Sequence, residues 1–198
     1  MVKLNKIYTR TGDAGETGLA DGSRISKGDP LAAAIGDVDE ANCAIGIALT
    51  HVDGQAVRSI LGRIQNELFD LGADLATPGD DFTPSETVLR IVTDQVDRLE
   101  QEIDAVNEGL APLKSFILPA GAAGAAHLHL ARAIVRRAER SAVAASRGRS
   151  VSSTPLNPLA LTYLNRLSDL LFVLARRIGQ AESGEVLWRP GATRQPDV

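Results

Sequence analysis

Hydrophobic residues recur at helical spacing over most of the chain from residue 29 onward, as expected for helices with one buried face. The pattern predicts five helices, at 29–52, 55–75, 85–108, from the Ala/Gly run at 120–126 to about 146, and 157–182. Asp29-Pro30 and Asn157-Pro158 are typical helix starts, because Asp and Asn cap the first turn and Pro suits its first residue. Long amphipathic helices with short links indicate an all-α, antiparallel five-helix bundle.

Two segments differ in composition from the helical pattern. Residues 1–28 are polar and glycine-rich and are predicted to form an extended arm. Residues 183–198, which contain Trp188 and two prolines, are predicted to form an irregular tail. No linker or internal repeat divides the chain, so residues 1–198 are interpreted as one domain with an arm, a bundle over 29–182 and a tail.

The fourth predicted helix has the most informative pattern, a polar face that carries Arg132, Arg136 and Arg140 one turn apart. Arg137 and Glu139 stand beside this stripe, and the opposite face is apolar. Neighbouring guanidinium groups repel one another unless an anion lies between them, and Arg binds phosphate through a planar fork. The stripe therefore predicts a triphosphate site, although a solvated face with Glu139 as an internal partner fits the spacing about as well.

The arm contains three glycines at intervals of three residues, Gly12, Gly15 and Gly18, with hydroxyl groups and an arginine nearby. Glycine lets the backbone turn with positive φ and direct N–H groups at an anion. The pattern is neither a Walker A loop nor a dinucleotide fingerprint, so a flexible arm remains an alternative to phosphate binding. Lys27, just before the first helix, could add a charge for the phosphates or could be an ordinary surface lysine.

Polar residues also interrupt two other helices. Asp37, Asp39 and Glu40 lie in the first helix, where Asp39 points away from the apolar stripe. Such an acid could pair with an arginine of another helix or subunit, or it could simply be solvated. Asn165 lies within the fifth helix, where Asn is intrinsically unfavourable. Its amide is therefore expected to bind a nucleotide or to make a structural bond to a neighbouring helix.

Composition argues against several classes of function. The chain has 21 basic and 25 acidic residues, and a net charge of −4 argues against a nucleic-acid binder. His51, His127 and His129 lack metal-ligand spacing, so a protein-bound zinc is not expected. The single cysteine, Cys43, excludes an internal disulfide and is predicted to be a small buried side chain. A cytoplasmic protein with neither a signal peptide nor a membrane span is the simplest interpretation.

Taken together, these segments resemble the PduO-type ATP:cob(I)alamin adenosyltransferases. The matching segments follow the family's order over nearly the whole chain: residues 8–17, Lys27, 34–40, 116–119, 132–140 and 163–169. The resemblance implies a homotrimer of five-helix bundles with active sites between subunits. It also implies in-line attack by the cobalt of cob(I)alamin at C5′ of ATP, with magnesium present, which gives adenosylcobalamin and triphosphate.

The resemblance further implies roles for individual residues. The arm would wrap the triphosphate, with Lys27 on the same phosphates, through Thr9, Arg10, Thr11, Gly12, Thr17 and Gly18. Asn165 would hydrogen bond the nucleotide, and Glu139 could also hold magnesium. The fourth helix would line the nucleotide site with Arg136, Arg137, Glu139 and Arg140.

On the cobalamin side, Asp39 would pair with Arg132 across the subunit interface, close to the corrin ring. Phe116 would lie under the corrin and displace the lower cobalt ligand. One departure is Ala120, because the family usually has a glycine pair after Pro119. A non-catalytic carrier that delivers adenosylcobalamin is the alternative function, although a carrier needs no triphosphate site. A reductase and a cobalamin-dependent enzyme are the partners that the resemblance suggests; nucleic acid and membranes are not expected.

Overall fold

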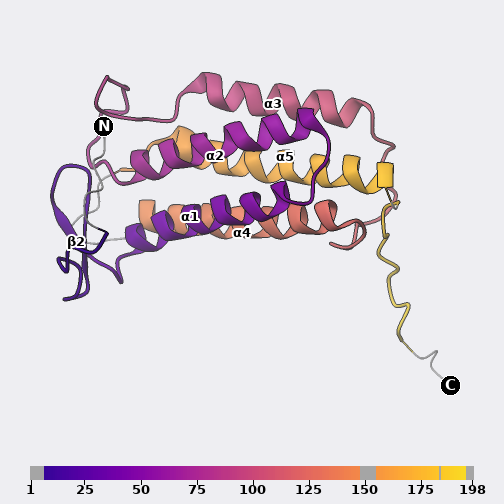
Figure 1. The fold of residues 1–198 in the computed structure, drawn as a ribbon, viewed down its shortest axis with the longest axis horizontal. Coiled ribbons are helices and arrows are strands. Elements are labelled where there is room, and N and C mark those ends of the chain that lie inside the picture. Colours follow the sequence, from indigo (N-terminus) through magenta and orange to yellow (C-terminus); the bar gives the residue numbers. More distant parts are fainter. Residues whose placement is uncertain (1–6, 148–154, 183, 195–198) are drawn as a thin grey trace.

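The computed structural model describes residues 7–147, 155–182 and 184–194. Within them, five helices confirm the predicted all-α bundle: α1 (Pro30–Leu49), α2 (Gln55–Leu75), α3 (Thr93–Glu108), α4 (Ala123–Arg147) and α5 (Pro158–Glu182). As Figure 1 shows, α1, α3 and α5 run in one direction and α2 and α4 in the other. The bundle therefore has two ends, and the loops at each end bring together segments far apart in the sequence.

Alanine-rich faces meet where α1 packs on α4. Ala34, Ala41 and Ala48 on α1 and Ala131 and Ala138 on α4 are fully buried, so the two backbones can approach closely. Larger aliphatic side chains of α2 and α5 fill the rest of the core. This packing keeps the polar faces of α1 and α4 next to each other, which positions the residues discussed below.

The predicted starts of α1 and α5 are confirmed. Asp29 Oδ1 accepts a hydrogen bond from the N–H of Leu31 at 2.8 Å, and Asn157 Oδ1 accepts one from the N–H of Leu159 at 3.0 Å. Each carboxyl or amide oxygen satisfies a backbone donor that has no partner within the helix.

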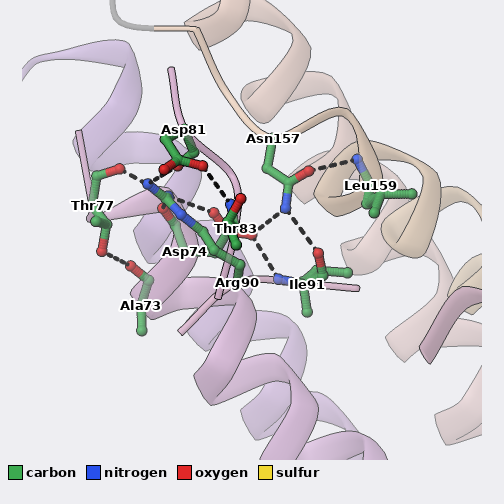
Figure 2. A network of polar contacts seen from close by, with 9 residues as sticks. All are labelled: Ala73, Asp74, Thr77, Asp81, Thr83, Arg90, Ile91, Asn157 and Leu159. Carbon is green, nitrogen blue, oxygen red and sulfur yellow. Dashed lines mark hydrogen bonds and ion pairs between the residues drawn. The ribbon is translucent and has the colours of Figure 1, made fainter. Parts of the chain in front are cut away.

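The predicted start of the third helix is wrong, because α3 begins at Thr93 and not at Ser85. Leu89, which lies before this start, is half exposed. Figure 2 shows the cause. The Arg90 guanidinium ion-pairs with Asp74 at 2.8 Å and donates to the carbonyl oxygens of Asp74, Thr77 and Asp81, and Ile91 N–H donates to Asp74 Oδ2. These bonds hold the segment in an extended path.

Asn157 completes this network from the start of α5. Its Nδ2 donates to Asp74 Oδ2 at 2.7 Å and to the carbonyl oxygen of Ile91 at 3.0 Å. Asp74, Arg90 and Asn157 are all buried. One buried cluster thus ties the end of α2, the 77–92 loop and the start of α5 together, which fixes one end of the bundle.

The arm forms a small hairpin where only an extended segment was expected. Strands β1 (Glu16–Gly18) and β2 (Arg24–Ser26) pair antiparallel, with Thr17 opposite Ile25. The N–H of Ala20 donates to the carbonyl oxygen of Ala76 at 2.8 Å, which fastens the hairpin to the end of α2. The arm therefore lies at the end of the bundle where α1 begins (Figure 1).

The link between α3 and α4 lies at the opposite end, beside the described part of the tail (Figure 1). Ile117 and Leu187 form an antiparallel bridge, so the tail pairs with the link instead of running free. None of the helices within the described residues is long and apolar enough to cross a membrane.

The prediction that Cys43 is buried is wrong, because its side chain is exposed. The buried positions around it on α1 are Ala41, Asn42, Ala44 and Ile45. Cys43 lies one helical turn after Asp39, which is also exposed, so both side chains are on the outer face of α1. This face therefore carries small apolar residues as well as charged ones.

Candidate active site

The glycine-rich part of the arm folds into two successive turns. The N–H of Asp13 donates to the Arg10 carbonyl and the N–H of Gly15 donates to the Gly12 carbonyl at 3.2 Å. Arg10 has a positive φ of 63°, which is uncommon for a residue with a side chain. The hydroxyl groups of Thr9 and Thr11 lie 2.9 Å apart. This segment is thus a compact loop with hydroxyl and basic side chains.

Lys27 lies against this loop, as the phosphate hypothesis requires. The backbone N–H of Lys27 donates to the Gly15 carbonyl at 2.8 Å. A Cβ placed on Gly12 would lie 3.1 Å from Lys27 Nζ and 3.2 Å from the Glu16 carbonyl oxygen. The absence of a side chain at Gly12 therefore lets the ammonium group approach the backbone.

A cavity of about 500 Å³ opens between the arm, α1 and α2. The arm contributes Thr17, Gly18 and Lys27 to its wall, and α1 contributes Asp39. The remaining wall is mostly apolar and includes small residues of both helices, such as Gly36, Gly72 and Ala73. The structure therefore brings four of the predicted site residues to one hollow.

The arginines of α4 fall into two groups. Arg137 pairs with α1, because its Nε lies 3.1 Å from Asp37 Oδ1 and its Nη2 contacts Glu40. The hydrogen bond that Arg137 donates to Glu40, together with the negative charges of Glu40 and Asp37, raises the pKa of Arg137. Ser141 also donates to Asp37, at 2.5 Å. Asp37 and Glu40 thus have an arginine partner within the chain.

Arg136 and Arg140, in contrast, are exposed, and neither makes an ion pair with any described residue. Arg140 donates to the carbonyl oxygen of Arg136 at 3.0 Å. Arg132 is partly buried and lies over the ring of Phe172 at 6.0 Å, and its Nε has no acceptor among the described residues. Burial, and then the charge of Arg136, lowers the pKa of Arg132. This stripe is a set of cations with spare donors.

Asn165 and Glu139 bond to each other. Asn165 Nδ2 donates to Glu139 Oε1 at 2.9 Å, and Arg166 donates to Asn165 Oδ1 at 2.6 Å while also pairing with Glu100. A polar chain therefore joins α4, α5 and α3. Of the two roles expected for Asn165, the bond between helices is present in this structure.

Phe116 does not join the residues above. Phe116 is 76% exposed and belongs to the link between α3 and α4. Figure 1 shows this link at the other end of the bundle from the arm. Arg140 follows the first residue of α4 by 17 positions, about 25 Å along the helix axis. Within a single chain, Phe116 and the glycine-rich loop therefore lie at opposite ends of the bundle. Within the described residues, Asp39 and Arg132 likewise make no hydrogen bond or ion pair with each other, and Arg132 lies against Phe172 instead.

Sequence reasoning missed two residues in these surroundings. Ser141 holds Asp37 beside Arg137, and the i+4 spacing of Arg137 and Ser141 was a usable signal. Trp188 contacts the Phe116 ring, with centroids 5.9 Å apart, across 72 positions of sequence, so no local pattern predicted the contact.

Comparison with known proteins decides the family. A family model for cobalamin adenosyltransferase matches residues 7–178 of this chain. The chain belongs to the cobalamin adenosyltransferase family. The matched region includes the glycine-rich loop, both groups of arginines and Phe116, so the resemblance proposed from the sequence is confirmed.

Relatives of the family match over most of their length. A corrinoid adenosyltransferase of Mycobacterium tuberculosis is 52% identical over 197 residues, which cover 98% of this chain and 97% of that protein. A corrinoid adenosyltransferase of Bacillus subtilis is 42% identical, covering 90% of this chain and 89% of that protein. The solved structure of a variant PduO-type ATP:corrinoid adenosyltransferase from Lactobacillus reuteri, complexed with cobalamin and ATP, has a TM-score of 0.83 and 38% identity, covering 93% of this chain and 97% of that chain.

Proposed function

We propose that this protein is an enzyme that transfers the 5′-deoxyadenosyl group of ATP to the cobalt of cob(I)alamin. The observation that carries the proposal is membership of the cobalamin adenosyltransferase family across residues 7–178. The relatives are named as transferases, and nothing favours the alternative of a non-catalytic carrier. The products are adenosylcobalamin and inorganic triphosphate.

The reaction needs positioning and charge stabilisation more than acid–base catalysis. The cobalt of cob(I)alamin supplies the electron pair of the new Co–C bond, the C5′–O bond of ATP breaks, and triphosphate leaves with that bond's electrons. The chain must therefore align C5′ with the cobalt and stabilise the developing charge on the leaving group. Cationic groups and backbone N–H donors suit that task, and no activated nucleophile is required.

The triphosphate is proposed to lie between the glycine-rich loop and the α4 arginines. The nearness of Lys27 Nζ to Gly12 supports the loop half of this site. The exposed guanidinium groups of Arg136 and Arg140, which form no ion pair within residues 7–147, 155–182 and 184–194, support the other half. The other loop residues proposed to wrap the phosphates are Thr9, Arg10, Thr11, Thr17 and Gly18.

The two halves are proposed to meet across a subunit interface in a homotrimer. Asp39 is exposed on α1, and the Arg132 Nε has no acceptor among the described residues, so each could serve the other in a neighbouring subunit. Phe116 is highly exposed, which suits an aromatic residue that covers the lower face of a corrin. An interface would also bring it near a nucleotide bound at the other end of a neighbouring bundle.

Magnesium is proposed to accompany the triphosphate, with Glu139 as the protein ligand. Oε1 of Glu139 accepts from Asn165, which orients the carboxylate and leaves Oε2 for the metal. The described residues contain no group of three or more His, Cys, Asp and Glu side chains that could hold a metal ion. One carboxylate with phosphate oxygens and water suits magnesium, which is often bound in that way. Arg137, held by Asp37 and Glu40, would line the nucleotide site.

We place this activity in the cytoplasm, with a reductase that supplies cob(I)alamin and an enzyme that uses adenosylcobalamin as partners. These proposals rest on the chemistry of the substrates, because cob(I)alamin must be generated by reduction and its adenosylated product is itself a cofactor.

The test is an anaerobic reaction of purified protein with ATP, magnesium and chemically reduced cob(I)alamin, followed by the cobalt absorption spectrum. We expect a light-sensitive alkylcobalamin and an equal amount of triphosphate. ATP cleavage to ADP, or cleavage that does not need cobalamin, would contradict the proposed function.

A further inference from the structure

We propose that Trp188 is a positioning residue of the cobalamin site, and that the tail segment 185–188 holds the Phe116 ring in place. The inference rests on the proposed function, in which Phe116 lies against the corrin. It assigns a role to a segment far from the arginine stripe and the glycine-rich loop.

Backbone pairing joins the tail to the residues around Phe116. The N–H of Trp188 donates to the Phe116 carbonyl at 2.8 Å, and the N–H of Leu118 donates to the Val186 carbonyl at 2.8 Å. The Ser115 hydroxyl donates to the Trp188 carbonyl at 2.7 Å. Three bonds therefore fix the main chain at Phe116 and set Trp188 directly beside it.

The ring contact follows from this pairing. The Phe116 and Trp188 rings are tilted by 59° with centroids 5.9 Å apart, within the range that aromatic pairs prefer. Phe116 remains 76% exposed and Trp188 44% exposed. Trp188 thus supports part of the Phe116 ring and leaves most of it open to a flat apolar ligand.

The tail itself is anchored to α5. Gly184 has a φ of 78°, which glycine adopts readily where the chain reverses. Glu185 then accepts from Arg176 Nε at 2.7 Å and from Gln180 at 3.1 Å. Burial of Glu185 acts to raise its pKa, but the hydrogen bonds from Arg176 and Gln180 hold the pKa below its usual range. The carboxylate is therefore charged at neutral pH.

Arg176 also holds the link. It is 4% exposed, and its Nη2 donates to the Ala111 carbonyl at 2.7 Å. One buried guanidinium group therefore binds both the start of the 110–122 link and the start of the tail. Because both segments share this anchor, the contact between Phe116 and Trp188 is part of a fixed assembly.

The test is a double-mutant cycle of Trp188→Ala and Phe116→Ala, with the KM for cob(I)alamin measured at saturating ATP. We expect Trp188→Ala to raise this KM by about twofold to tenfold, the range that an aromatic contact is worth, and to leave the KM for ATP unchanged. In the Phe116→Ala background it should have no further effect. Trp188→Phe should restore most of the loss, and Arg189→Ala, the exposed neighbour, should have none.

The absorption spectrum of bound cob(II)alamin gives a second readout, because it reports whether the lower cobalt ligand is displaced. If the tail had only a structural role, Trp188→Ala would leave this spectrum unchanged. We expect the substitution to shift the spectrum toward that of cob(II)alamin with its lower ligand bound. Trp188→Leu, which keeps apolar volume, repeats the cycle so that the test does not depend on one variant folding.

Two outcomes separate the inference from the function on which it rests. If Phe116→Ala impairs cobalamin binding but Trp188→Ala does not, or if their effects are additive, the positioning role is overturned and the proposed function stands. If Phe116→Ala leaves cobalamin binding unchanged while the wild type still forms adenosylcobalamin, the role of Phe116 is wrong and the inference falls with it.

Discussion

Two arginine sites in this bundle have opposite surroundings. Arg90 is buried and bonded to four oxygen atoms of Asp74, Thr77 and Asp81, although its Nε has no acceptor in the described part of the chain. Arg136 and Arg140 are exposed on α4 and make no recorded ion pair with the described residues. A guanidinium group that the protein itself surrounds with acceptors stabilises the fold. One with unused donors beside other cations is available to an anion.

The sequence alone does not show which of these arginines is neutralised inside the protein and which is free to bind an anion. Arg90 lies in a stretch whose apolar residues resemble the start of a helix, and its partners on α2 are 16 positions away. The α4 stripe is visible at once, because its residues are one turn apart. Local spacing thus identifies residues that share a face, but it does not reveal whether a distant carboxylate neutralises them.

The largest expected effect is at Arg90. Arg90→Ala should lower the free energy of unfolding by about 3–5 kcal/mol, because it leaves the buried Asp74 carboxylate without its cation. Chemical denaturation of the wild type and the variant measures this. At temperatures where the variant is folded, its affinity for ATP should be near that of the wild type. A variant as stable as the wild type would show that the network in Figure 2 is not a structural anchor.

Arg136 should show the reverse behaviour. Arg136→Ala should lower kcat/KM for ATP by about 100-fold, the usual loss for one donor to a developing charge. Arg136→Lys should recover only part of this, because a bidentate contact is lost. The unfolding free energy should change by less than about 0.5 kcal/mol, as for other exposed positions. Wild-type turnover in Arg136→Lys would remove Arg136 from the triphosphate site.

A smaller effect is expected for the pair formed by Asp39 and Arg132. If they meet across a subunit interface, Asp39→Asn and Arg132→Met should show a coupling of about 1 kcal/mol in kcat/KM for cob(I)alamin. Sedimentation of each variant controls for loss of the oligomer. Strictly additive effects in an intact oligomer would argue against this contact.

The smallest effect concerns His129, one turn before Arg132 on α4. Burial, and then the charge of Arg132, lowers the pKa of His129 from 6.5. The unfolded chain therefore binds a proton before the folded one as pH falls. The stabilising contribution is complete above pH 6.5 and is lost as pH decreases toward the lower folded pKa. His129→Gln should flatten the pH dependence of the unfolding free energy in that range, and an unchanged slope would contradict this account.

Much of the fold followed from residue periodicity, and the departures have identifiable causes. The starts of α1 and α5 were predictable because their capping residues lie within two positions of the N–H groups they bind. The start of α3 was not, since Asp74 and Asn157 hold the preceding segment from other parts of the chain. Cys43 was placed wrongly because alanine, glycine and cysteine do not mark which side of α1 is buried.

In the candidate site, too, some contacts could be predicted from the sequence and others could not. The closeness of Lys27 to the glycine-rich loop could be anticipated because both lie in one short segment, and phosphate binding by Lys27 stays a prediction. The pairing of Arg137 with Asp37 and the contact of Phe116 with Trp188 join positions 100 and 72 residues apart. Such contacts depend on how the helices and their connections pack, and the chain's local patterns do not specify them.

The most direct test of the central claim is a calorimetric titration of inorganic triphosphate into the wild type, Arg136→Ala and Arg140→Ala at two salt concentrations. We expect the wild type to bind triphosphate more weakly at high salt, and each variant to bind at least about tenfold more weakly than the wild type at low salt. Equal affinity in all three proteins would contradict the proposal that the exposed Arg136 and Arg140 hold the leaving triphosphate.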